Sequence, residues 1–277
     1  MGEKNNIKGS AAKASEYRFK RLRTQLLIQD FQFKKTAPGP GDPLPEFDLV
    51  TTTGDRIKTK DYIDKQPLLL IFGSVTCPMT VSSFTPLKRL YSKFGDKITF
   101  VMLNVREAHP GENYQQPETL DEKLEHAKAM KGHYDIPWTV AVDDIDGSLH
   151  RALDTKPNAA YLMNTDGKIA FRSLWAGDEQ GLEQTLERVS AGKNPVKPQS
   201  VAMFGPLARG IGYFHEVLKH AGPQAQRDLL KAAPPMFLVG RIALLFRPLS
   251  RNSRGIAALA TLGSLIVMTI GVVIWFS

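Results

Sequence analysis

The chain has 277 residues, of which 42% are hydrophobic and 23% charged, a balance that suits one or two globular domains with a sizeable core. Its single cysteine excludes an intramolecular disulfide, and the paired cysteines typical of oxidising compartments are absent. The net charge of +8 gathers in two basic ends, residues 1–37 and 201–277, but no nucleic-acid-binding motif accompanies them, and we expect no nucleic-acid partner.

The first 66 residues divide into two parts. Residues 1–37 form a polar, basic arm, with a helix expected around residues 17–33. A Pro- and Gly-rich stretch follows, and then a short apolar strand that ends in a turn at Thr53, Gly54 and Asp55. The arm therefore precedes the first regular elements of a folded domain.

The next 126 or so residues alternate strand and helix patterns. Continuous apolar runs predict buried strands at 67–74, 98–105 and 137–144. Helical spacing predicts helices at 85–95, 117–134, 147–155 and 178–192, and Thr119 and Glu122 fit a capping box. An Asp166–Gly167 turn joins two strands within 159–175. This order predicts an α/β domain over residues 38–192 with a thioredoxin-like fold, a central mixed sheet flanked by helices.

The C-terminal residues point to a membrane. Residues 256–276 carry no charge and are long enough for a transmembrane helix, with Trp275 near one end. Residues 193–255 are basic and partly amphipathic, and within them 234–249 is expected to lie at the interface, with a second span as the alternative. Arg247, Arg251 and Arg254 flank the span, so the positive-inside rule predicts a single-pass C-terminal anchor with the catalytic domain on the cytoplasmic side.

Cys77 is the first candidate for chemistry. It follows the predicted central strand 67–74 and opens a helix, at the sheet edge where open α/β folds place active sites. A helix N-terminus favours a thiolate, and Pro78 suits the first helical turn. A buried structural cysteine is the competing interpretation. Position 80 is Thr80, so Cys77 has no partner within the chain, and an external thiol must resolve any oxidised sulfur.

Glu107 and His109 follow the next strand at the same sheet edge. Alternation aims both residues to one side if the strand geometry continues. A carboxylate beside an imidazole can orient it and tune its pKa, which predicts a proton relay. A surface loop with ordinary polar residues is the alternative.

The motifs "FGSVTCP", "EAHP" and "VDDIDGSLHRAL…YLMNTDGKIAFR" resemble the iodothyronine deiodinase family, over roughly residues 65–180. The resemblance implies that Cys77 attacks iodine on an aromatic ring, and that an external thiol then reduces the sulfenyl iodide. It also implies that His109, Glu107, Ser74 and Thr76 relay a proton to the ring carbon, with Ser74 and Thr76 as hydrogen-bond partners of the thiolate. Pro157 would be a cis-proline facing the sulfur, so that Pro157 and Pro78 face the substrate.

Two departures from the family pattern concern the residues that hold the substrate and the nucleophile. Pro117 and the pair Asn158–Ala159 stand where animal members carry the His and Arg that hold the hormone. The nucleophile is sulfur where many members use selenium, which implies slower chemistry.

Two other functions compete with deiodination. "GDPLPEFDLVTTTGD" resembles the opening of peroxiredoxins, and Ser74 and Cys77 fit the peroxidase motif, but Leu70 replaces its proline. A thiol peroxidase is therefore the alternative enzyme, and a non-catalytic redox-fold binding module is the third hypothesis.

The expected partners follow from these hypotheses. They are membrane lipid, an aromatic halide or a peroxide, and a thiol reductant, either a protein or a small thiol; a homodimer is left open. We expect no bound cofactor and no metal, because the remaining histidines show no ligand spacing and are interpreted as structural or exposed, namely His126, His133, His150, His215 and His220.

Overall fold

The computed structural model describes residues 17–275. Its helices are α2 (Thr24–Gln29), α3 (Pro78–Phe94), α4 (Leu120–His133), α5 (Ser148–Leu153), α6 (Glu179–Ser190), α7 (Phe204–Ile211), α8 (Phe214–Ala221), α9 (Pro223–Ala232), α10 (Pro234–Ile242) and α11 (Arg251–Trp275), with short 3₁₀ turns at Thr59–Asp61 and Ala243–Phe246. The strands are β1 (Asp48–Thr51), β2 (Arg56–Lys58), β3 (Leu68–Gly73), β4 (Thr99–Asn104), β5 (Thr139–Val142), β6 (Ala160–Met163), β7 (Ile169–Ser173) and β8 (Gln199–Ser200).

One mixed sheet joins all these strands in the order β2-β1-β5-β4-β3-β6-β7-β8. Its centre is parallel: β4 lies between β3 and β5, with Leu70 opposite Val101 and Val101 opposite Thr139. β6 pairs antiparallel with β3 and continues into β7 through a turn in which Gly167 has φ 80°. The sequence β3-α3-β4, then β6-β7-α6, is the connectivity of a thioredoxin-like fold, so the predicted fold class is confirmed.

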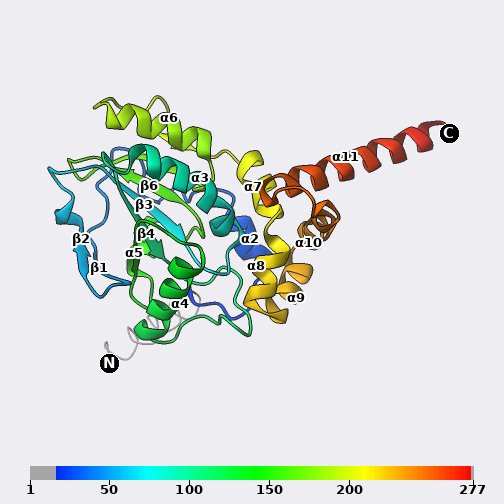
Figure 1. Ribbon diagram of the computed structural model, residues 1–277, viewed down its shortest axis with the longest axis horizontal. Coiled ribbons are helices and arrows are strands. Elements are labelled where there is room, and N and C mark those ends of the chain that lie inside the picture. Colours follow the sequence, from blue (N-terminus) through cyan, green and yellow to red (C-terminus); the bar gives the residue numbers. More distant parts are fainter. Residues whose placement is uncertain (1–16, 276–277) are drawn as a thin grey trace.

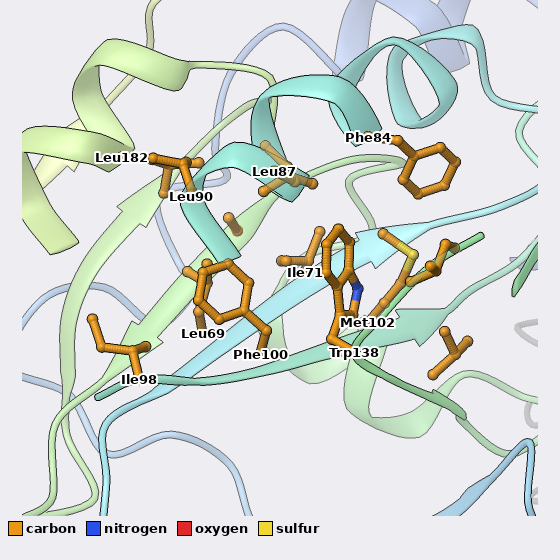
Figure 2. Packing of buried hydrophobic residues seen from close by; sticks show 14 of the residues in the cluster. Leu69, Ile71, Phe84, Leu87, Leu90, Ile98, Phe100, Met102, Trp138 and Leu182 are labelled. Carbon is orange, nitrogen blue, oxygen red and sulfur yellow. The ribbon is translucent and has the colours of Figure 1, made fainter. Parts of the chain in front are cut away.

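Both faces of the central strand β3 are buried. On one face Leu69 and Ile71 pack with residues of α3, α4 and α6, and Figure 2 shows Leu87, Leu90 and Leu182 over this face beside Phe100 and Trp138. On the other face, Leu68, Leu70 and Phe72 pack with α5 and with residues that precede β1. A strand buried on both sides must be apolar throughout, which is why the run at 67–74 is continuous.

The structure refines the ends of the predicted elements. Thr119 caps α4 by accepting a hydrogen bond from the Glu122 backbone N–H at 3.2 Å. The Glu122 carboxylate returns to the N–H of Glu118 at 2.7 Å, one residue before the position that a capping box requires. Helix α3 begins directly after Cys77, so it extends the predicted helix by more than a turn toward the cysteine.

Helices α7–α10 lie beside the sheet domain, and α2 from the N-terminal arm lies between the two groups (Figure 1). These helices share a hydrophobic core with the arm, to which Leu22, Phe214 and Leu229 contribute. Arg21 clamps the arm through two hydrogen bonds to Asp228 from Nε, each 2.9 Å. The arm from Tyr17 onward and the basic C-terminal segment therefore take part in the folded structure.

Helix α11 projects away from the rest of the molecule (Figure 1). Within residues 17–275 it is the helix that is long and apolar enough to cross a membrane, and the stretch Arg251–Ile270 is 12% buried. Its 25 residues correspond to about 37 Å at an α-helical rise. The apolar segment Pro234–Phe246 is shorter than the roughly 20 residues that a span needs, which leaves the second-span alternative without support.

Candidate active site

Cys77 and His109 lie at the carboxyl ends of two neighbouring parallel strands. The chain leaves β3 at Gly73 and turns back through a hydrogen bond of 3.2 Å from the Cys77 N–H to the Ser74 carbonyl. Cys77 is the residue before the first turn of α3, as its position after a buried strand predicted. His109 follows β4 by five residues, so the parallel pairing brings the two motifs to the same edge.

An apolar cavity of about 50 Å³ separates this edge from the arm and the C-terminal helices. Cys77, Pro78, His109 and Pro157 all line it, which brings together both predicted reactive groups and both predicted substrate-facing prolines. The remaining lining comes mainly from large apolar side chains of α2, α7, α8, α9 and α10 and from Trp175. The cavity is smaller than the roughly 150 Å³ in which an engineered protein cavity holds benzene, so an aromatic ring requires these covering elements to shift.

The Cys77 thiol is more basic than the sequence suggested. Its residue is 2% exposed, and burial raises the pKa of Cys77 to about 11. Hydrogen bonds from Thr80 and from the backbone at Met79 favour the thiolate, but they do not offset desolvation. The prediction that the helix N-terminus lowers the pKa of Cys77 is therefore wrong, because burial in the cavity outweighs it. Thr80, at the position of the missing second cysteine, is the first of the groups that oppose this rise.

Glu107 is fully buried and binds residues other than His109. One carboxylate oxygen accepts hydrogen bonds from the Thr76 hydroxyl at 2.6 Å and from the Thr76 N–H at 3.2 Å. The other oxygen contacts His126 Nδ1 at 2.9 Å. The expected direct pairing of Glu107 with His109 is therefore wrong, because the loop turns after Glu107 instead of continuing as a strand. His126, which the sequence analysis interpreted as structural or exposed, is therefore a member of this hydrogen-bond network.

His109 is held by its backbone and presents a neutral ring to the cavity. Its N–H donates to the Thr76 hydroxyl at 3.1 Å, so Thr76 links it to Glu107. Burial lowers the pKa of the His109 imidazole to about 4. Nδ1 is buried and has no hydrogen-bond partner among residues 17–275. The His109 ring therefore lines the same cavity as the Cys77 thiol with its Nδ1 atom available for a hydrogen bond.

Ser74, Pro157 and the pair Asn158–Ala159 were also singled out in the sequence. Ser74 is buried, and its hydroxyl accepts a hydrogen bond from the Ala108 N–H at 3.2 Å, which fixes the loop that carries His109. The cis form expected at Pro157 is wrong, because no cis peptide bond occurs in the described part of the chain. Asn158 and Ala159 are buried without charge, and Asn158 Nδ2 donates to the Phe72 carbonyl at 3.1 Å.

Two charged residues at the cavity were absent from the sequence prediction. Asp30, from the end of α2, lines the cavity, and burial raises the pKa of its carboxyl to about 7 against the lowering effect of Arg106 and Lys156. Arg106 also lines the cavity, one residue before Glu107. No local pattern marks Asp30, since only tertiary packing brings the arm over the sheet. Within residues 17–275 no group of three His, Cys, Asp or Glu side chains could hold a metal ion.

The family of the chain follows from sequence comparison. The profile described as iodothyronine deiodinase matches residues 4–176, more than half of the chain, and includes Cys77, Glu107 and His109. This chain belongs to the iodothyronine deiodinase family. The membership confirms the resemblance carried by the two motifs, and it leaves the reaction to experiment.

Individual relatives match over shorter stretches. Thyroxine 5-deiodinase from Gallus gallus is 30% identical over 156 residues, covering 52% of this chain and 59% of that protein. Thyroxine 5-deiodinase from Sparus aurata is 28% identical over 118 residues, covering 39% and 43%. The matches thus span less than two thirds of these relatives.

Solved structures resemble the sheet domain more distantly. An uncharacterized conserved protein from Geobacillus kaustophilus has a TM-score of 0.49 at 16% identity, covering 60% of this chain and 89% of that one. A putative thiol:disulfide interchange protein DsbE from Chlorobium tepidum has a TM-score of 0.45 at 22% identity, covering 56% and 99%.

Proposed function

We propose that the chain is a one-cysteine thiol oxidoreductase that removes iodine, or another heavy halogen, from an aromatic substrate. The observation that carries the proposal is that Cys77 and His109 line one apolar cavity while the sequence has no second cysteine. A disulfide cannot form within the chain, so the sulfur must exchange with an external thiol. Membership in the deiodinase family supports halogen as the leaving atom.

The proposed reaction has two halves. The Cys77 thiolate attacks iodine, so that an S–I bond forms, the C–I bond breaks and the aryl carbon takes a proton. The neutral His109 ring, which lines the same cavity, takes the proton that the Cys77 thiol loses and passes it to the aryl carbon. Two external thiols then convert the sulfenyl iodide to the Cys77 thiol, releasing their own disulfide together with iodide and a proton. The aromatic substrate is reduced by two electrons, and the external thiols supply both.

The buried network behind the loop positions His109. Thr76 accepts from the His109 N–H and donates to Glu107, which in turn contacts His126. Because Thr76 and His126 both bind the Glu107 carboxylate, movement of the loop would leave this buried group without partners. We assign Thr76, Glu107 and Ser74 as positioning residues and His109 and Cys77 as the residues that meet the substrate.

The high pKa of Cys77 limits the rate in the closed state. With a pKa of about 11, only about one thiol in ten thousand is ionised at pH 7. Displacement of the covering helices admits a substrate and water together, which reduces the desolvation that raises the pKa. Substrate binding therefore promotes formation of the thiolate nucleophile.

A thiol peroxidase is the second candidate. Arg106 lines the same cavity as Cys77, and an arginine near a reactive thiol can polarise a peroxide. Its guanidinium already donates to the carbonyls of Tyr17 at 2.9 Å and Thr155 at 3.4 Å, which reduces its capacity to hold a peroxide. We therefore rank dehalogenation first.

Helix α11 is proposed to anchor the enzyme in a membrane with the sheet domain on the cytoplasmic side. Arg247, Arg251 and Arg254 lie at the end of the span that adjoins the folded domain. In sealed microsomes, whose cytoplasmic face is outward, an added protease is expected to digest the sheet domain, and protection of that domain would contradict this orientation.

A substrate panel tests the function. The full chain in detergent is incubated with an iodinated phenol, hydrogen peroxide or a protein disulfide and excess dithiol, in parallel with Cys77→Ser. Iodide release that needs Cys77 supports the proposal. Peroxide turnover without iodide release would establish the peroxidase instead, and absence of every turnover in the wild type would leave a binding module.

A further inference from the structure

The second half of the proposed reaction leaves one proton without an acceptor in the site. In the first half the proton that Cys77 loses ends on the aryl carbon, so His109 only passes it on. In the second half two external thiols lose two protons, of which one returns to Cys77 and the other goes to solvent. A thiol attacks as its thiolate, so a group beside Cys77 that accepts this second proton would accelerate the step.

Asp30 lies on the side of the cavity that the N-terminal arm forms. It follows α2, and its neighbour Phe31 packs edge-on against Trp175 beside the cluster that contains Cys77. Asp30 and Cys77 both line the cavity of about 50 Å³, so a small thiol that reaches the sulfur also approaches the carboxylate. Burial is the main cause of the raised Cys77 pKa, and the Asp30 carboxylate adds to it, which places the two groups within electrostatic range.

The backbone on both sides of Asp30 is tied to the loop that precedes β6. The carbonyl of Gln29 accepts a hydrogen bond from the buried Lys156 Nζ. The N–H of Lys34 donates to the buried Asp154 Oδ2 at 2.8 Å. The Asp30 carboxylate itself takes part in no hydrogen bond or ion pair within residues 17–275. Its position is therefore fixed while its oxygens stay available to a proton donor.

The charges around Asp30 leave it a better proton acceptor than His109. Burial of the carboxyl raises the pKa of Asp30 to about 7, against the lowering effect of Arg106 and Lys156 and with a smaller raising effect of Asp154. A thiol has a pKa of about 8.5, so transfer of its proton to Asp30 is unfavourable by only about 30-fold. Transfer to His109, whose pKa is about 4, is unfavourable by about 30,000-fold.

We propose that Asp30 is the general base of the second half-reaction and takes the proton of the external thiol as its sulfur attacks Cys77. An S–S bond forms, the S–I bond breaks, iodide leaves and the proton rests on the carboxyl. Asp30 is half-buried, so this proton can pass to solvent. A second thiol then resolves the mixed disulfide, and its proton goes to the departing Cys77 sulfur. This inference rests on the proposed one-cysteine chemistry and adds a catalytic residue to it.

A small mixed disulfide isolates this half of the reaction. Methyl methanethiosulfonate converts Cys77 to its methyl disulfide in the full chain in detergent, and mass spectrometry follows the reduction. Two neutral reductants are compared: 2-mercaptoethanol, which must lose a proton, and tris(hydroxypropyl)phosphine, which has no thiol proton to lose. Because no halogen is present, the result does not depend on whether the chain releases iodide.

Asp30→Asn is expected to slow reduction by the thiol about 10²-fold at pH 7 and to leave reduction by the phosphine within about 2-fold. Between pH 6 and 8 the wild-type rate with the thiol should level off as Asp30 ionises, whereas the rate of the variant should rise about 10-fold per pH unit with the free thiolate. Asp30→Glu keeps the carboxylate and should recover most of the rate. Asp96→Asn, at an exposed position outside the cavity, is the matched control and should behave as the wild type.

Two results would overturn the assignment of Asp30. Equal slowing of both reductants in Asp30→Asn would show that the residue only shapes the cavity. An unchanged rate with the thiol would show that solvent takes the proton. Thermal unfolding of both Asp30 variants checks the fold. If Asp30→Asn does not fold, the wild-type profile decides, because a rate that rises about 10-fold per pH unit throughout would exclude the base.

Discussion

Replacement of Glu107 distinguishes positioning from mere packing. Its carboxylate is fully buried and receives three contacts, two from Thr76 and one from His126. In Glu107→Gln the amide oxygen can accept both bonds from Thr76, while the NH₂ group donates to His126 Nδ1 in its other tautomer. In Glu107→Ala every partner loses its bond and a cavity remains.

The hydrogen bonds that each variant keeps or loses determine the expected changes in unfolding free energy and in activity. Exchange of charged for neutral hydrogen bonds in the Gln variant is expected to cost about 1–2 kcal/mol of unfolding free energy. The Ala variant, which strands buried polar groups, is expected to lose about 3–5 kcal/mol. If Glu107 fixes the loop that carries the proton donor, the Gln variant should still lose about 10²-fold or more in iodide release.

Urea unfolding of the detergent-solubilised chain gives the stabilities, and iodide release under excess dithiol gives the rates. Glu125→Gln is the matched control, because Glu125 is one residue before His126 and its side chain is 70% exposed. A Gln variant that is as unstable as the Ala variant, or that is stable and retains wild-type activity, would refute a positioning role for Glu107.

Three further predictions use the same protein. The alkylation rate of Cys77 should rise about 10-fold per pH unit from pH 8 to 10, since its pKa is about 11, and a plateau near pH 9 would contradict burial of the thiol. The fold holds His109 neutral, with a pKa of about 4, whereas the same ring in the unfolded chain takes a proton near pH 6.5. Protonation of the unfolded chain therefore lowers the free energy of unfolding as the pH falls from about 6.5 to 4, by up to about 3 kcal/mol. In His109→Asn the urea midpoint should therefore fall less steeply between pH 6.5 and 4 than in the wild type. An equally steep fall would show that His109 does not cause this pH dependence. Asp228→Asn weakens the clamp from Arg21 and should accelerate Cys77 alkylation at constant pH, whereas an unchanged rate would show that the arm does not close the cavity.

The active-site loops were the part of the site that sequence could predict. Cys77 and His109 come together because each follows an apolar run that could only be a buried strand, and parallel neighbours end at one edge. Contacts within the site were harder to predict. Glu107 faces His126 on α4 instead of His109, since the side-chain direction after a strand depends on how the loop turns.

The sequence by itself determined the thioredoxin-like order of elements, the one-cysteine character and the apolar C-terminal helix, because these follow from periodicity, composition and the position of one sulfur. Tertiary structure alone decided the environment of that sulfur. The arm and helices α7–α10 close over Cys77, and their burial of the thiol outweighs the helix N-terminus in setting its pKa. Desolvation depends on what covers a group from distant parts of the chain, and the local sequence contains no record of it.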